Sequence, residues 1–286
     1  MSTPVFRLRV DDDTYWARLG EDPGERRDGE IAAHRLMTGI GLPVPRVVRY
    51  EADPPELDRS IALTTHVPGV PVSTLQPAPW LTHVAVEAGR VLARINAIKV
   101  SGFGWAYASE RQGIPIGQYP TRAAWAGEYR EALRKLQASD ALPVHVMRAV
   151  SVAVETWASA PDLATASLAH GDFDASHLFV DPGQQALTGI IDFGEARGAG
   201  RFYDLGHLLL HDGEDGRPEI FTSVLRGYAD IHPLPGDVLD RIRLEATAVG
   251  TRALSIQVDR PPSPYRDWLA TRLGFLADSS QEDRSV

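Results

Sequence analysis

The segment from His170 to Arg197 constrains the fold of this chain most, because it combines a hairpin pattern with carboxylates at both ends. Two apolar runs, Leu178 to Val180 and Leu187 to Ile191, are joined by a stretch that begins Asp-Pro-Gly. Apolar runs separated by such turn residues are typical of a β-hairpin. A hairpin here would bring Asp172 and Asp192 together.

Two carboxylates held by one hairpin suit phosphoryl transfer. This reaction needs one carboxylate to orient and deprotonate an acceptor hydroxyl, and another to hold Mg²⁺ against the nucleotide phosphates. Positioning and charge neutralisation supply most of the catalysis. The short segment could therefore provide both groups.

The same residues resemble the aminoglycoside phosphotransferase family, which comprises antibiotic and small-molecule kinases that share the protein-kinase fold. The chain has His170-Gly171-Asp172, Ile191-Asp192-Phe193-Gly194 and Tyr203-Asp204-Leu205 in the order of that family's motifs. The resemblance implies that Asp172 is the catalytic base and Asp192 the principal Mg²⁺ ligand. It also implies that Asp204 is a structural acid that braces the loops.

His177 departs from the family pattern, which has a metal-binding Asn five residues after the Asp of the catalytic loop. Mg²⁺ prefers hard oxygen ligands to imidazole. Either Asp192 and water hold the metal, with His177 in another role such as a phosphate contact, or His177 joins Asp192 as a ligand. Asp174 is a candidate substitute oxygen ligand.

The resemblance implies a bilobal α+β protein with a protein-kinase-like fold. Residues 1–66 would form a small N-lobe around an antiparallel sheet, and residues 67–286 a mainly helical C-lobe. The C-lobe would contain the catalytic loop, residues 170–177, the metal-binding strand end, residues 190–195, and acceptor-binding helices.

Helical periodicity dominates the chain after the hinge. It predicts helices over residues 79–97, 122–139, 144–158, 203–210, 217–230 and 235–259. The polar tail, residues 279–286, is expected to be frayed.

The first 98 residues contain no lysine, so the strand lysine that contacts nucleotide phosphates in kinases has no counterpart there. The alternating run from Thr14 to Leu19 predicts a strand, and Glu30 falls in the next helical pattern, residues 28–37. Arg18 and Glu30 are the natural substitutes for the usual pair, since arginine can bind phosphate through two N–H groups. A surface strand arginine is the simpler alternative.

The N-lobe is also short. Only one strand-like segment, Val5 to Val10, precedes the strand that contains Arg18, and the first glycine is Gly20. Family members usually have a further strand and a nucleotide-covering loop upstream. Either this lobe is reduced, or its first strand lies outside the given sequence.

The run from Ile61 to Gly69 resembles the family's strand and interlobe hinge. The resemblance implies that the backbone C=O of Thr65 and the N–H of Val67 face the nucleobase. Such contacts do not distinguish ATP from GTP. A strand followed by an ordinary Pro-Gly turn is the alternative interpretation.

Five residues near the motifs are candidates for acceptor contacts: Asp174, Glu195, Arg197, His207 and His211. His207 and His211 are four residues apart on a predicted helix and could face one metal, which leaves open a metal-dependent phosphohydrolase. The kinase order of the motifs around the hairpin favours a transferase.

Charge and hydropathy limit the partners. The 29 Lys and Arg against 38 Asp and Glu give a net charge of −9, which argues against general nucleic-acid binding. Acids at 212–215 and near 219 could attract a cationic acceptor, although solvated loops are the simpler interpretation. No apolar run reaches the roughly 20 residues that span a bilayer, and we expect a cytoplasmic protein with no membrane partner.

Together these features predict a Mg²⁺-dependent kinase that transfers the γ-phosphate of ATP or GTP to a hydroxyl of a small molecule. An antibiotic is the leading acceptor, in resistance or self-resistance. Kinases of choline, homoserine or sugars share the signature. A pseudokinase is a third possibility, because of Arg18, His177 and the short N-lobe. We expect a monomer or a homodimer.

Overall fold

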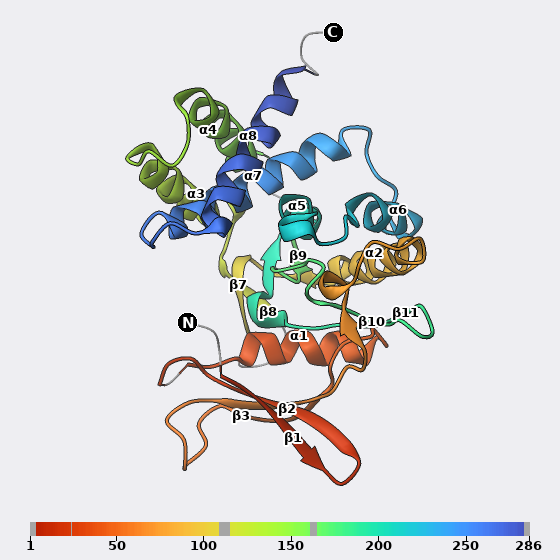
Figure 1. The fold of residues 1–286 in the computed structure, drawn as a ribbon. Coiled ribbons are helices and arrows are strands. Elements are labelled where there is room, and N and C mark those ends of the chain that lie inside the picture. Colours follow the sequence, from red (N-terminus) through yellow and green to blue (C-terminus); the bar gives the residue numbers. More distant parts are fainter. Residues whose placement is uncertain (1–3, 24, 109–114, 161–164, 283–286) are drawn as a thin grey trace.

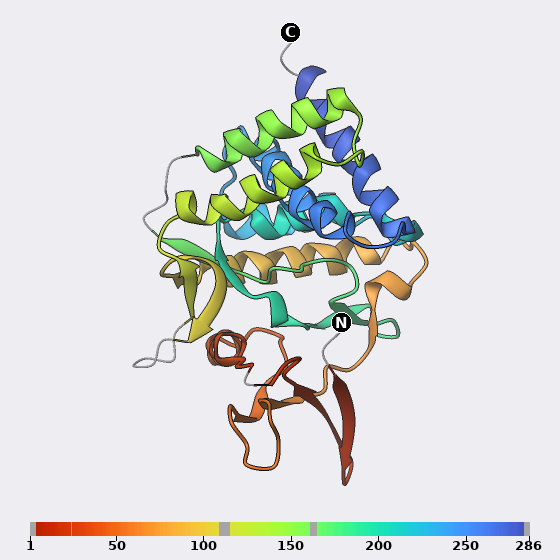
Figure 2. The same cartoon turned by 90° about the vertical axis from the view of Figure 1, so that its left-hand side faces the viewer.

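The computed structural model describes residues 4–23, 25–108, 115–160 and 165–282. A small sheet lies at one end of the molecule and most of the helices lie at the other, with the first helix between them (Figure 1). The catalytic hairpin lies on the side of the helical part that faces this first helix (Figure 2). The bilobal α+β organisation expected from the sequence is therefore present.

The N-terminal lobe is a four-stranded antiparallel sheet in the order β1-β2-β4-β3, with one helix against it. Its elements are β1 (Val5–Val10), β2 (Asp13–Leu19), α1 (Asp28–Gly39), β3 (Val47–Glu51) and β4 (Ile61–Thr65). The predicted strand that contains Arg18 and the predicted helix that contains Glu30 are both confirmed.

The predicted hairpin is also confirmed, as β10 (Leu178–Asp181) and β11 (Ala186–Ile190). Strand β10 also pairs with β5 (Val70–Pro71), which follows the hinge and precedes the short helix η1 (Val72–Thr74). This pairing attaches the hinge to the catalytic hairpin.

A five-stranded sheet in the order β6-β9-β12-β7-β8 lies in the C-terminal lobe and was not predicted. Its strands are β6 (Lys99–Val100), β7 (Phe103–Ala108), β8 (Pro115–Tyr119), β9 (Ala166–Ala169) and β12 (Arg197–Ala199). Strands β6 and β12 contain only two and three residues, too few for an alternating pattern. Strand β9 leads directly into the catalytic loop.

Helices form the rest of the C-terminal lobe: α2 (Leu81–Ala97), α3 (Arg122–Gln137), α4 (Val144–Ala158), α5 (Tyr203–His211), α6 (Phe221–Ile231), α7 (Val238–Gln257) and α8 (Pro264–Glu282). Three single turns, η1, η2 (Phe193–Glu195) and η3 (Glu214–Gly216), are 3-10 helices. None of the described helices is long and apolar enough to cross a membrane.

Two helix predictions were wrong in part. Helix α6 begins at Phe221 rather than 217, because Asp212 accepts hydrogen bonds from the N–H groups of Ile220 and Phe221 at 2.7 and 3.2 Å. Helix α8 was not predicted, and residues 279–282 of the supposedly frayed tail belong to it. Residues 283–286 lie outside the described residues. Leu269 and Leu273 are fully buried, so tertiary packing stabilises α8.

The core of the C-terminal lobe contains a cluster of aromatic rings from α3 and α4. The Trp125 ring lies 5.2 Å from Tyr129 and 5.6 Å from Trp157, and the last two rings are 4.4 Å apart. All three side chains are almost completely buried. Large apolar groups packed at such distances make the lobe a rigid support for the loops at its edge.

Candidate active site

The catalytic loop, residues 170–177, is anchored by a carboxylate on α5. Asp204 is fully buried and accepts hydrogen bonds from the N–H groups of His170 and Gly171, each at 2.9 Å. It also accepts one from the Asn96 amide at 2.9 Å. These bonds brace the loop as the resemblance implies for Asp204.

Gly171 is required by its backbone and by its surroundings. Its φ of +90° is one that L side chains rarely adopt, and a Cβ there would lie 1.9 Å from the backbone oxygen of Glu195. The close contact holds the catalytic loop directly against the segment that follows Asp192.

His170 joins the two motifs. Its Nε2 lies 2.8 Å from the backbone oxygen of Ile191, and its Nδ1 accepts the N–H of Asp172 at 3.2 Å. One nitrogen donates and the other accepts, so the ring is neutral in this arrangement. Burial lowers the pKa of His170, which favours the same form.

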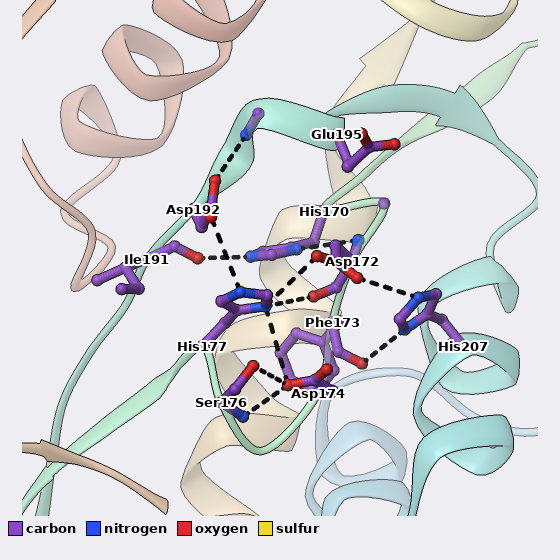
Figure 3. Close-up of polar contacts among 12 residues, drawn as sticks. His170, Asp172, Phe173, Asp174, Ser176, His177, Ile191, Asp192, Glu195 and His207 are labelled. Carbon is purple, nitrogen blue, oxygen red and sulfur yellow. Dashed lines mark hydrogen bonds and ion pairs between the residues drawn. The ribbon is translucent and has the colours of Figure 1, made fainter. Parts of the chain in front are cut away.

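Asp192 follows β11 in a left-handed conformation, with φ 63° and ψ 66°. Its Oδ1 accepts from Arg18 Nη1 at 2.7 Å. Its Oδ2 lies 3.8 Å from His177 Nε2 (Figure 3). Burial alone would raise the pKa of the Asp192 carboxyl, but the positive charge of Arg18 outweighs it and the pKa is lowered. Asp192 is therefore an ionised group with one oxygen directed at His177.

His177 lies between the two carboxylates that the hairpin was predicted to bring together. Its Nδ1 is 2.7 Å from the backbone oxygen of Asp172, which can only accept, so Nδ1 carries a proton. The same nitrogen is 3.9 Å from the Oδ2 of Asp172. Nε2 is directed towards Asp192, and in a neutral ring it has a free lone pair.

His207, on α5, contacts Asp172 directly. Its Nε2 lies 3.2 Å from the Oδ1 of Asp172, and its Nδ1 lies 3.2 Å from the backbone oxygen of Phe173 (Figure 3). Burial by itself would raise the pKa of the Asp172 carboxyl. The hydrogen bond and charge of His207 outweigh burial, and the pKa lies well below its ordinary value. Burial lowers the pKa of His207, but Asp172 outweighs it and the pKa is raised.

His211 lies one turn after His207 and stacks on it, with ring centroids 4.4 Å apart. Its Nδ1 is 3.0 Å from the backbone oxygen of His207, and its Nε2 is 3.1 Å from the hydroxyl of Tyr265. Burial and then the charge of His207 lower the pKa of His211 to about 4. Both rings are engaged with protein groups, so this arrangement gives no support to a shared metal on these two histidines.

Asp174 lies on the opposite side of the loop and accepts hydrogen bonds from the N–H and hydroxyl of Ser176. Ligand atoms of Asp172, Asp174 and His177 lie within 4.8 Å of one another. Within this cluster, Asp174 Oδ1 and His177 Nδ1 already have hydrogen-bond partners.

Arg18 and Glu30 form the ion pair that the sequence predicted, at 3.2 Å. Arg18 therefore bridges Glu30 and Asp192. Gly194 makes this contact possible, because a Cβ there would lie 2.9 Å from Arg18 Nη2. A glycine two residues after Asp192 leaves room for the guanidinium group.

The four residues predicted to contact nucleotide, Arg18, Glu30, Thr65 and Val67, line one cavity of about 310 Å³ between the lobes, as does Asp192. The sequence did not identify the other residues that line it, which include Trp16, His34, His66 and Phe179. These residues alternate along a strand or stand alone in the sequence, so no local pattern predicts that they line one cavity.

Glu195 and Arg197 are paired with each other. Arg197 is almost completely buried; its Nε donates to the backbone oxygen of Glu195 at 2.9 Å, and its Nη2 contacts the Glu195 carboxylate. Burial raises the pKa of the Glu195 carboxyl although Arg197 opposes this effect.

Two further cavities adjoin Asp172. One, of about 410 Å³, contains both Asp172 and Asp192 in its lining, together with Arg18. The other, of about 300 Å³, lies on the side of α5 and α7 and is lined by Asp172, His207 and His211. Sequence reasoning missed three residues that line it, because they are far from every motif: Arg252 on α7, Arg260 in the loop after α7, and Tyr265 on α8.

The model of the "Phosphotransferase enzyme family" matches residues 1–243. The chain belongs to the phosphotransferase enzyme family. The match includes both motifs of the hairpin, so the resemblance inferred from them is confirmed. No curated protein matches this phosphotransferase in a sequence comparison.

Solved structures share the fold of this phosphotransferase at low identity. Aminoglycoside phosphotransferase APH(4)-Ia has 20% identity and a TM-score of 0.72, with 98% of this chain and 90% of that chain covered. Macrolide 2'-phosphotransferase MphH from Brachybacterium faecium has 17% identity and a TM-score of 0.61, with 96% and 88% covered. A thermostable mutant of APH(4)-Ia in ternary complex with AMP-PNP and hygromycin B has 18% identity and a TM-score of 0.71, with 97% and 90% covered.

Proposed function

We propose that this phosphotransferase transfers the γ-phosphate of ATP or GTP to a hydroxyl group of a small molecule. One observation carries the proposal. Asp192 lines the cavity between the lobes, Asp172 lines the cavity beside α5 and α7, and both line the cavity that joins these two. A phosphate donor in the first cavity and an acceptor in the second would meet between the two carboxylates.

Asp172 has the geometry of a group that orients an acceptor hydroxyl and takes its proton. Its Oδ1 is held by His207, whereas the one ion-pair contact of its Oδ2 among the described residues is with His177, at 3.9 Å. About two fifths of the side chain is exposed, so an alcohol can reach it. The hydroxyl oxygen would attack the γ-phosphorus in line as Asp172 takes the proton. The bond from this phosphorus to the oxygen of the β-phosphate would break, and the nucleoside diphosphate would leave, while Arg18 contacts the phosphates from the N-lobe.

The residues around Asp192 fit a divalent cation. Asp192 Oδ2 and His177 Nε2 are 3.8 Å apart, and the Nδ1–H bond of His177 to Asp172 leaves Nε2 available as a ligand. We propose that Asp192 and His177 hold Mg²⁺ or a similar ion. When bound, such an ion neutralises charge on the nucleotide phosphates.

We propose two classes of acceptor, of which antibiotics are one, because solved structures with this fold include an aminoglycoside and a macrolide phosphotransferase. Metabolite hydroxyls, as in choline, homoserine or sugars, are the competing class. ATP or GTP in the cytoplasm would be the phosphate donor for either class of acceptor. The site is built within one chain, so both a monomer and a homodimer are compatible with the proposal.

A mass-spectrometric screen tests the proposal. Purified protein is incubated with ATP or GTP, Mg²⁺ and a panel of antibiotics and metabolites. We expect one compound to gain a phosphoryl group, and the gain to disappear with Asp172→Asn. Nucleotide binding without turnover across the panel and without slow hydrolysis would instead indicate a pseudokinase. No nucleotide binding would contradict the proposal itself.

A further inference from the structure

The residues that line the 300 Å³ cavity beside Asp172, which we call the α7 pocket, indicate the chemistry of the acceptor. The residues that line it include Asp172, Glu195, Arg197, His207, Arg252 and Arg260. None of its lining residues belongs to the cavity between the lobes. If the proposed function holds, this pocket receives the acceptor, and its charges select the acceptor.

Both carboxylates of the α7 pocket already face a cationic side chain. Glu195 is paired with the buried Arg197. Asp172 is paired with His207, whose two nitrogens both face oxygen atoms and whose pKa is raised. A positively charged group of an acceptor would therefore find no unopposed carboxylate in this pocket.

The positive charges of two guanidinium groups in the pocket are not fully neutralised by the described carboxylates. Arg252, on α7, makes one ion pair among the described residues, from Nε to Glu128 Oε2 at 3.5 Å, and Glu128 also accepts from Tyr119. Arg260 is exposed and forms no ion pair with any residue that the structure describes. The N–H donors of both are available to an oxygen anion.

The acidic residues that the sequence suggested for binding a polycationic acceptor do not line the α7 pocket. Asp212 caps α6 through the N–H groups of Ile220 and Phe221, and Glu214 is buried with Arg217 at 3.6 Å. Neither lines the α7 pocket. The N-lobe acids Glu21 and Asp22 line only the joining cavity, beside Arg18.

We propose that the acceptor carries an anionic oxygen group, a carboxylate or phosphate, which Arg252 and Arg260 bind while the reacting hydroxyl lies at Asp172. A guanidinium fork matches the paired oxygens of such groups. A compact hydroxy acid or phosphate ester fits the pocket volume of about 300 Å³.

Three probes of similar size and different charge test this inference: gluconate, glucose and glucosamine. Isothermal titration into protein saturated with AMP-PNP and Mg²⁺ gives their dissociation constants. We expect gluconate to bind about tenfold or more tightly than glucosamine, with glucose between them. The double variant Arg252→Glu, Arg260→Glu should reverse this order. Arg226→Glu makes the same kind of charge change on the exposed face of α6 and should leave the order unchanged.

Other results overturn the inference. Tightest binding of glucosamine, an order that the double variant does not alter, or no binding of any probe would each contradict it. So would phosphorylation of hygromycin B that the double variant leaves undiminished. Failure of the proposed function has a different signature, since AMP-PNP would then not bind the wild-type protein. A double variant that binds AMP-PNP with unchanged affinity shows that the site has kept its fold.

Discussion

Nε2 of His207 lies 3.2 Å from Oδ1 of Asp172, and the opposite nitrogen of the same ring lies 3.2 Å from the backbone oxygen of Phe173. The ring thus clamps the side chain of Asp172 to the main chain of the next residue. Because one carboxylate oxygen is held, the orientation of the other is fixed in the cavity that Asp172 lines together with Asp192. This contact makes His207 a positioning residue for the proposed base.

Replacement of His207 by Gln should lower kcat by roughly 100-fold, because a misdirected base loses the in-line geometry. Affinity for AMP-PNP should not change, since His207 does not line the cavity between the lobes. Steady-state kinetics and nucleotide titration measure the two effects. His145→Gln, at an exposed position of α4, is the control and should behave as wild type. A loss of nucleotide affinity equal to the loss of kcat would point to general unfolding instead.

Asp172→Asn should lower kcat by about 10² to 10⁴, the range for a lost general base, and leave nucleotide binding intact. The exposed Asp140 offers a matched control as Asp140→Asn. The pH profile of residual turnover adds a second measurement. Full activity in the Asp172→Asn variant would remove this residue from the mechanism.

The pair of His207 and Asp172 predicts how the stability of the folded protein depends on pH. Asp172 raises the pKa of His207 above its ordinary 6.5. The stability that the folded protein gains from this shift is complete below pH 6.5 and is lost as pH rises through the folded-state pKa. His207 lowers the pKa of Asp172, so that contribution is present above 3.8 and is lost only as pH falls through the lower folded value. His207→Gln should therefore lower Tm more at about pH 6 than at about pH 9. An equal loss of Tm at the two pH values would exclude an ionic pair.

Gly194→Ala should weaken nucleotide binding by about threefold, because the new Cβ would lie 2.9 Å from Arg18 Nη2 and the flexible end of this side chain would have to shift. Gly127→Ala is the matched control, since a Cβ there meets no atom within 4 Å. Titration with AMP-PNP compares the two variants. Equal affinities would mean that Arg18 does not bind the phosphates.

His177 should give the enzyme an unusual metal preference. Imidazole suits Mn²⁺ better than Mg²⁺, so we expect half-maximal activity at a lower concentration of Mn²⁺. His177→Asn provides an amide oxygen as ligand and an N–H₂ group for the backbone oxygen of Asp172, and should shift the preference towards Mg²⁺. Activity titrations with each ion measure the ratio. An unchanged ratio would place His177 outside the metal site.

The sequence by itself determined the parts of this protein that depend on neighbours along the chain. The hairpin, its turn and the two flanking carboxylates lie within one segment, and local pattern is enough to define strands of four or five residues around a Pro-Gly turn. The pairing of Arg18 with Glu30 followed from one strand and the next helix, and the structure confirms that ion pair at 3.2 Å.

Only the tertiary structure decided which distant side chains share a pocket. His207 is 35 positions beyond Asp172, and Arg252 and Arg260 are farther still, yet α5, α7 and the loop after α7 place them in the lining of the same pocket. Helical periodicity indicates that a face is buried but does not indicate which loop it meets, because that depends on packing between elements. The charge balance of the acceptor pocket, and therefore the acceptor that it favours, arises from that packing.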